Sequence, residues 1–177
     1  MKTTSELSVG LLGPEIDHKN SLTAMLNGRL RELSWIPDSN SFLKKKLGTP
    51  SRLTRLRQKW DRLTHTRDPD YLKMVCQAID THHIDVLLSY WGTEPLPDLL
   101  AIRKLRPQVR LVLMVLCYPV ALAPLGIARQ NWMMKRACHV LDGIIFPNEA
   151  MATYFQQQGL LSAQPPASLV MPPAWPR

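Results

Sequence analysis

The sequence has 177 residues and a mass of 20.2 kDa, which suits one compact domain with a hydrophobic core of its own. Apolar residues make up 45% of the chain and charged residues 20%, a globular composition that excludes a disordered, collagen-like or disulfide-stapled protein. Three cysteines without a C-x-x-C pair indicate neither a disulfide framework nor a zinc ribbon, and no secretory signal is visible, so we expect a cytoplasmic protein.

The chain opens with the pattern of a strand and then a helix. The apolar run Ser8–Leu12 ends at Gly13, which predicts a short buried strand and its exit turn. After residue 20, leucine and methionine recur at helical spacing as far as Leu33. We therefore expect a helix that ends before Pro37.

Residues 44–67 carry the entire formal net charge of the chain, which is +8. The segment contains nine lysine and arginine residues against Asp61 alone, so the remainder of the chain is neutral overall. Apolar side chains recur three or four residues apart within it, at Leu53, Leu56, Trp60 and Leu63. This pattern predicts a basic amphipathic helix, inserted in the domain.

The basic segment favours binding at an anionic membrane surface. Its apolar stripe would enter the headgroup region, while each cation gains about 1 kcal/mol near an anionic leaflet. The candidate membrane-binding residues are Lys44, Lys45, Lys46, Arg52, Arg55, Arg57, Lys59, Trp60 and Arg62. This partner would place the protein peripherally at the inner face of the membrane. Two other interpretations stay open, a solvated basic face and, least favoured, binding to nucleic acid.

Alternating helices and strands follow the basic segment. An N-cap at Asp68 predicts a helix that ends near His82, and the run VLLSY at residues 86–90 predicts a buried strand. A short helix is expected over residues 95–105. The run at residues 109–117 is apolar on both faces after its second residue, which is typical of an interior parallel strand.

Residues 111–128 contain no charged side chain. Pro119, Pro124 and Gly126 interrupt this stretch, which favours a buried strand followed by an apolar loop at 120–127 over a transmembrane helix. Beyond the loop we expect a helix, a strand, a second helix and a last short apolar run, over residues 128–141, 143–146, 149–158 and 169–171.

This alternation predicts an α/β fold, a doubly wound parallel sheet of Rossmann-like type with helices on both faces. We expect the domain to cover residues 1–163, including the basic insert at 44–67. Five prolines in residues 164–177 predict an extended tail or linker. In such folds, ligands bind in the crevice at the carboxyl ends of the strands.

Polar and aromatic residues follow several of the predicted strands, at the turns that would line this crevice. The candidate ligand-binding residues are Gly13, Trp91, Thr93, Glu94, Tyr118 and Asn148. An aromatic ring beside hydroxyl and carboxylate groups suits a sugar or a lipid headgroup. In the alternative interpretation, Trp91 packs over the sheet edge and Thr93 or Glu94 caps the next helix.

Two stretches, DVLLSYWGTEPLPDLLAIRKLRPQVRLVLMVLCYP and LDGIIFPNEAMATYFQQQG, resemble the N-terminal, acceptor-side domain of GT-B glycosyltransferases, particularly the retaining enzymes of family 4. The resemblance covers about residues 84–160. It implies that the crevice residues bind a saccharide or lipid-linked acceptor, to which a sugar is transferred from a nucleotide sugar. The family's donor site lies mainly in a C-terminal domain. The resemblance therefore implies an acceptor-binding half that is inactive without a donor domain. Two interpretations of this half stay open, a truncated gene product and a subunit whose donor domain is a separate chain.

The chain departs from the pattern of that family at three turns. Gly13 is followed by Pro14 instead of further glycines, Cys117 and Tyr118 stand where many members have a histidine, and Asn148 stands where many have a serine. We expect no metal and no cofactor, because no histidine or cysteine pair has ligand spacing. The competing hypothesis is a non-enzymatic Rossmann-like module that binds membrane or nucleic acid through residues 44–67.

Overall fold

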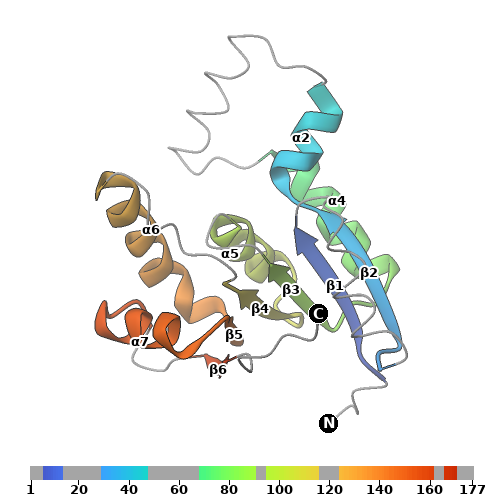
Figure 1. The fold of residues 1–177 in the computed structure, drawn as a ribbon. Coiled ribbons are helices and arrows are strands. Elements are labelled where there is room, and N and C mark those ends of the chain that lie inside the picture. Colours follow the sequence, from blue (N-terminus) through green and yellow to red (C-terminus); the bar gives the residue numbers. More distant parts are fainter. Residues whose placement is uncertain are drawn as a thin grey trace, which may run out of the picture. The chain divides into compact units, whose positions relative to one another are not determined.

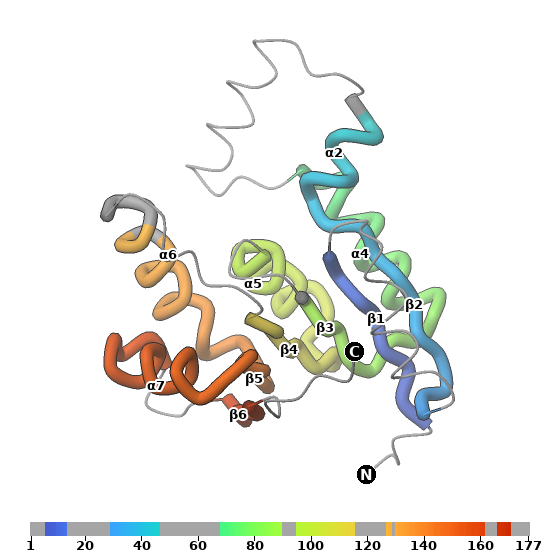
Figure 2. The backbone as a smooth tube through the Cα atoms, in the orientation of Figure 1, coloured from blue at the N-terminus to red at the C-terminus, as the bar shows by residue number. Residues whose placement is uncertain are grey.

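The computed structural model of the protein describes residues 6–13, 29–47, 68–90, 95–115, 124–161 and 166–170, and Figure 2 traces their backbone. Two compact units divide the chain, residues 1–85 and 86–177. Within each unit, neighbouring strands are parallel, and in the second unit a helix lies between each strand and the next. The predicted α/β fold, a doubly wound parallel sheet of Rossmann-like type, is therefore confirmed.

The first unit contains a pair of parallel strands and two helices (Figure 1). These elements are β1 (Ser8–Gly13), β2 (Glu32–Pro37), α2 (Ser39–Leu47) and α4 (Pro69–Thr81). All six residues of β1 are buried, as the prediction of a buried strand requires. Phe42 of α2 and Tyr71 of α4 bring their ring centroids to 5.5 Å, which packs the two helices together.

Strand β2 corrects the prediction of a helix that reaches Leu33. Along β2 burial alternates, with Ser34 and Ile36 buried and the residues between them half-buried, which is the period of a strand. The spacing of Leu30 and Leu33, three residues apart, also fits one face of a helix. Pro37 is the last residue of β2, a position where its missing N–H group is tolerated. The part of the predicted helix at 21–28 lies outside the described residues.

The predicted start and end of α4 are confirmed. Asp68 is the N-cap residue, and its side chain accepts a hydrogen bond of 2.9 Å from the backbone N–H of Asp70. Pro69 occupies the first turn, where no intrahelical partner for its nitrogen is needed. The helix ends with a C-cap at His82 and buries the side chains of Tyr71, Val75, Cys76 and Ile79.

The second unit is a parallel sheet with the strand order β3-β4-β5-β6 (Figure 1). Its elements are β3 (Val86–Tyr90), α5 (Leu96–Leu105), β4 (Arg110–Met114), α6 (Pro124–Ala137), a 3-10 turn (Cys138–Val140), β5 (Gly143–Phe146), α7 (Glu149–Gln157) and β6 (Ala167–Val170). Strands β3 and β5 and helices α5 and α7 were predicted with closely similar bounds. The predicted strand at 109–117 is longer than β4, and the 3-10 turn was predicted as the end of the helix at 128–141. Strand β6 lies within the segment for which an extended tail was predicted.

Helix α6 begins earlier than predicted. It starts at Pro124 instead of residue 128, so the expected apolar loop at 120–127 is wrong over its last four residues. Proline is well accommodated in the first turn of a helix, whereas the prediction treated Pro124 as a breaker. In the part of the chain that the structure describes, no helix is both long and apolar enough to cross a membrane.

One face of the second unit's sheet forms the core. Its side chains are at most 1% exposed, and they belong to Leu87, Ser89, Leu111, Leu113, Ile144 and Phe146. Phe155 of α7 packs on this face, with its ring centroid 5.1 Å from that of Phe146. The opposite face is less uniformly buried, since Leu88 and Met114 are 7% and 6% exposed but Val112 and Ile145 are only half-buried. Strands β3 to β6 lie side by side in the order of the sequence. Right-handed connections between such strands all pass over the same face of the sheet, which explains this asymmetry.

An aspartate extends the hydrogen-bonding ladder in each unit. The backbone N–H of Ser8 donates to Asp85 Oδ2 over 3.1 Å, and the N–H of Asp85 donates to the carbonyl of Ser8 over 2.9 Å. Leu111 and Asp142 exchange the same two bonds, at 2.7 and 2.8 Å. The carboxylate thus substitutes for a backbone carbonyl and satisfies an N–H group at the start of a strand, that of the first residue in β1 and of the second in β4.

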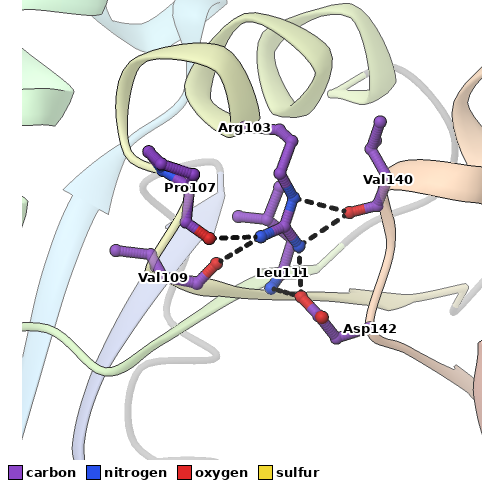
Figure 3. A network of polar contacts seen from close by, with 6 residues as sticks. All are labelled: Arg103, Pro107, Val109, Leu111, Val140 and Asp142. Atoms are coloured by element: carbon purple, nitrogen blue, oxygen red, sulfur yellow. Dashed lines mark hydrogen bonds and ion pairs between the residues drawn. The ribbon is translucent and has the colours of Figure 1, made fainter.

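Arg103, near the end of α5, holds the amino ends of β4 and β5 together (Figure 3). Its Nε and Nη2 atoms donate to the carbonyl of Val140 over 3.1 and 2.8 Å, and Nη1 donates to the carbonyls of Pro107 and Val109 over 2.9 and 3.0 Å. Nη2 also donates to Asp142 Oδ2. All five N–H donors of the guanidinium group are used, so this side chain has a structural role.

Replacement of Arg103 by glutamine should destabilise the second unit by about 2 to 4 kcal/mol, because four acceptors lose a charged partner at once. The midpoint of urea-induced unfolding measures this loss. Arg103→Lys is the matched control, since it keeps the charge but lacks the planar fork, and it should recover less than half of the loss. An unchanged midpoint in Arg103→Gln would contradict the structural role.

Candidate functional site

The strands of the second unit end together at one edge of their sheet. In the parallel register Tyr90 pairs with Met114, and Met114 pairs with Ile145, so the last residues of β3 and β4 and the penultimate residue of β5 are neighbours. The chain segments that follow these strands therefore all leave from the same edge. This is the edge at which open α/β sheets bind their ligands.

Asn148 follows β5 at this carboxyl edge and is exposed. Its side-chain oxygen accepts a hydrogen bond of 2.9 Å from the N–H of Met151, so Asn148 is the N-cap of α7. Its amide NH2 group makes no hydrogen bond within the described ranges of the chain. The same side chain thus has a structural role through its oxygen and offers a donor for a ligand through its nitrogen.

Gly13 ends β1 in the first unit and is buried. Its carbonyl oxygen accepts a hydrogen bond of 3.1 Å from the N–H of Asp38, the residue whose Oδ1 accepts from the N–H of Ser41 over 2.7 Å. Gly13 therefore connects the end of β1 to the start of α2. The other four candidates, Trp91, Thr93, Glu94 and Tyr118, lie outside the described residues, and their gathering with Asn148 stays a prediction.

Sequence reasoning missed two buried polar residues near the carboxyl edge. Ser89, the penultimate residue of β3, is fully buried, and its hydroxyl has no hydrogen-bond partner among the residues that the structure describes. Asp98, in the first turn of α5, is 2% exposed. A carboxylate in the first helical turn is favoured by the helix dipole. A single serine or aspartate within an apolar run was the only signal, and periodicity alone assigns such residues to packing.

The basic segment is described only at its start. Lys44, Lys45 and Lys46 form the last turn of α2 and are exposed. Lys46 Nζ lies 3.2 Å from Asp68 Oδ2 and 2.5 Å from Asp70 Oδ2. We call Lys46, Asp68 and Asp70 the lysine clasp, because their contacts join the end of α2 to the start of α4. The candidates between Arg52 and Arg62 lie outside the described residues.

The clasp changes the charge that this segment offers to a partner. Hydrogen bonds to Asp70 and Asp68 raise the pKa of Lys46. Burial raises the pKa of Asp68, but hydrogen bonds from Lys46 and from the backbone of Asp70 outweigh burial and leave this pKa below its usual value. Lys46 is therefore neutralised locally by two carboxylates, while Lys44 and Lys45 form no ion pair in the described part of the chain.

A separate contact in the first unit involves His82, one of the two adjacent histidines at the end of α4. His82 Nδ1 lies 2.6 Å from Glu32 Oε1, which also accepts from the hydroxyl of Ser34 over 3.1 Å. These hydrogen bonds, first that of His82, lower the pKa of Glu32. Among the described residues, no three histidine, cysteine, aspartate or glutamate side chains gather closely enough to hold a metal ion.

Comparison of the chain with models of known protein families found no match, and comparison with curated proteins found no relative.

Replacement of Asp68 by asparagine should remove the charge that pairs with Lys46 but keep the N-cap of α4, because asparagine also serves as an N-cap. We expect the midpoint of thermal unfolding to fall by roughly 1 to 2 °C near neutral pH, since exposed ion pairs stabilise weakly. The lowered pKa of Asp68 stabilises the fold above its ordinary value of 3.8, and this stabilisation is lost as the pH falls through the folded-state pKa. The difference in unfolding midpoint between the parent and Asp68→Asn should therefore vanish in strong acid. A difference that persists there would contradict the assignment.

Proposed function

We propose that the protein is the acceptor-binding half of a glycosyltransferase that transfers a sugar from a nucleotide sugar to a saccharide or membrane-associated acceptor. One observation carries this proposal: the parallel register that makes neighbours of Tyr90, Met114 and Ile145. Because of this register, the segments that contain Trp91, Tyr118 and Asn148 start from one edge of a single sheet. The resemblance to GT-B acceptor domains supplies the class of ligand.

The chemistry near this edge suits a polyhydroxylated ligand. Asn148 offers an exposed amide donor, and the sequence adds an aromatic ring at Trp91 and a carboxylate at Glu94. Sugars are bound through such combinations, since an aromatic face contacts their C–H groups while amides and carboxylates bond their hydroxyls. Donor recognition would depend on a further domain, so the proposal assigns no turnover to these residues alone.

Binding of mono- and disaccharides to the full chain, followed by NMR titration, tests this function. Trp91→Ala should weaken the binding of a saccharide ligand about tenfold, because the stacking surface is lost, whereas Trp91→Phe should retain most of the affinity. Asn148→Ser should also weaken binding without unfolding α7, since serine preserves the cap. If no saccharide in the panel binds, or if all three variants bind as the parent does, the acceptor site is not at this edge.

A second candidate function is interfacial binding by the basic segment, and the exposure of Lys44 and Lys45 favours it. The lysine clasp brings the two ends of the segment together, because Lys46 of α2 lies within hydrogen-bonding distance of Asp68 and Asp70 at the start of α4. An anionic membrane is the partner that fits a basic segment with an apolar stripe. A nucleic acid would also attract these charges but would not require the stripe.

Replacement of Arg55, Arg57, Lys59 and Arg62 together by glutamine should abolish the salt-sensitive binding of the basic segment to anionic vesicles. Co-sedimentation with vesicles of phosphatidylcholine and phosphatidylserine measures this. Asp70→Asn is an informative control, because it releases Lys46 from one of its two carboxylates and should strengthen binding. Undiminished sedimentation of the quadruple variant at every vesicle concentration would rule out this segment as a membrane contact.

A further inference from the structure

Helix α6 carries an exposed aromatic and cationic face. Among the residues whose burial is described, the exposed ones are Ala128, Trp132, Lys135 and Arg136 of α6 and His139 of the 3-10 turn that follows it. These residues recur three or four apart, and we call them the Trp132 face. The opposite side of the helix packs into the second unit through Met133, Met134, Ala137 and Cys138, all at most 6% exposed. The helix is thus held by one face and presents the other outward.

Trp132 is unusually exposed for its size, with 49% of its surface accessible. The guanidinium carbon of Arg136, one helical turn further on, lies 5.4 Å from the centroid of the Trp132 ring. This distance is that of a cation–π contact, so Arg136 holds the ring at the surface and places a positive charge beside it. The pair is therefore a fixed surface feature of α6.

The charge of the Trp132 face is unbalanced. No aspartate or glutamate occurs between Asp98 and Asp142, a stretch that includes the whole of α6. Of these two flanking acids, Asp98 is buried, and Asp142 pairs with Arg103. Lys135 and Arg136 have no ion pair within the described segments. An anionic partner would therefore meet two uncompensated cations on either side of an indole ring.

We propose that the Trp132 face binds an anionic phospholipid surface, as a contact separate from the basic segment at 44–67. Tryptophan prefers the membrane interface, where its ring lies at headgroup level, and each nearby cation adds attraction to anionic lipids. A specific protein interface usually covers about 800 Å² on each partner, whereas Trp132 is the one large apolar side chain among the residues that define this face. A fluid headgroup layer fits such a surface better than a rigid partner does.

This inference goes beyond the proposed function and stands without it, because α6 belongs to the second unit and the basic segment to the first. The Trp132 face could not be recognised from the net charge, because the formal charges of the residues outside 44–67 sum to zero. Only the fold separates the cations of α6 from the acids that balance them in the sum.

The test uses the full chain with vesicles of phosphatidylcholine, with and without phosphatidylserine. Lys135→Gln combined with Arg136→Gln should weaken binding to anionic vesicles about tenfold to thirtyfold. The matched control combines Lys104→Gln with Arg110→Gln, two exposed cations of the same unit and the same total charge, and should change binding far less. An equal loss in the control would show a response to net charge alone and would overturn the proposal.

A depth measurement separates this face from the basic segment. In a variant that keeps only Trp132, with Trp35, Trp60, Trp91 and Trp175 replaced by phenylalanine, brominated lipid should quench the fluorescence of vesicle-bound protein. Quenching should persist when Arg55, Arg57, Lys59 and Arg62 are also replaced by glutamine, even if total binding falls. Vesicle-bound protein without quenching, or a parent chain that binds no anionic vesicle, would overturn the proposal. Should the single-tryptophan variant not fold, the comparison of the two double variants decides.

Discussion

The guanidinium group of Arg103 is the constraint on which the second unit depends. It bonds the carbonyls of Val140, Pro107 and Val109 and the carboxylate of Asp142, and so joins the end of α5 to the starts of β4 and β5 (Figure 3). These groups belong to segments where strands begin, and without Arg103 they would be short of donors. One planar side chain thus holds the amino edge of the sheet in register.

Under the proposed function, stability and ligand binding belong to opposite edges of the same sheet. The amino edge is closed by Arg103 and by the exchange of hydrogen bonds between Leu111 and Asp142. The carboxyl edge carries the candidate ligand residues, of which Asn148 combines a cap with an exposed donor. Substitutions at the carboxyl edge can therefore change the ligand without loosening the register, as in other open α/β sheets.

Local signals in the sequence predicted most elements of the fold, and contacts distant in sequence explain what they missed. The apolar runs of β3 and β5 and the cap of α4 at Asp68 have short-range causes and were found. Strand β2 was missed, because leucine spacing before it resembled a helix and its pairing with β1 is not a local property. The role of Arg103 and the exposure of Trp132 were hidden for the same reason. At the candidate site, sequence reasoning predicted Asn148 as a ligand residue but not as a cap, and it passed over Ser89 and Asp98, whose burial only the fold shows.

The central claim is that ligand binding belongs to the carboxyl edge of the second unit. The most direct measurement is a map of backbone amide chemical shifts, recorded by NMR while a saccharide ligand is added to the isotope-labelled full chain. We predict that the shifts concentrate at the ends of β3, β4 and β5, around Tyr90, Val115 and Asn148, and leave the surroundings of Arg103 unchanged. Shifts concentrated around Arg103 and Asp142, with none at the strand ends, would contradict this account.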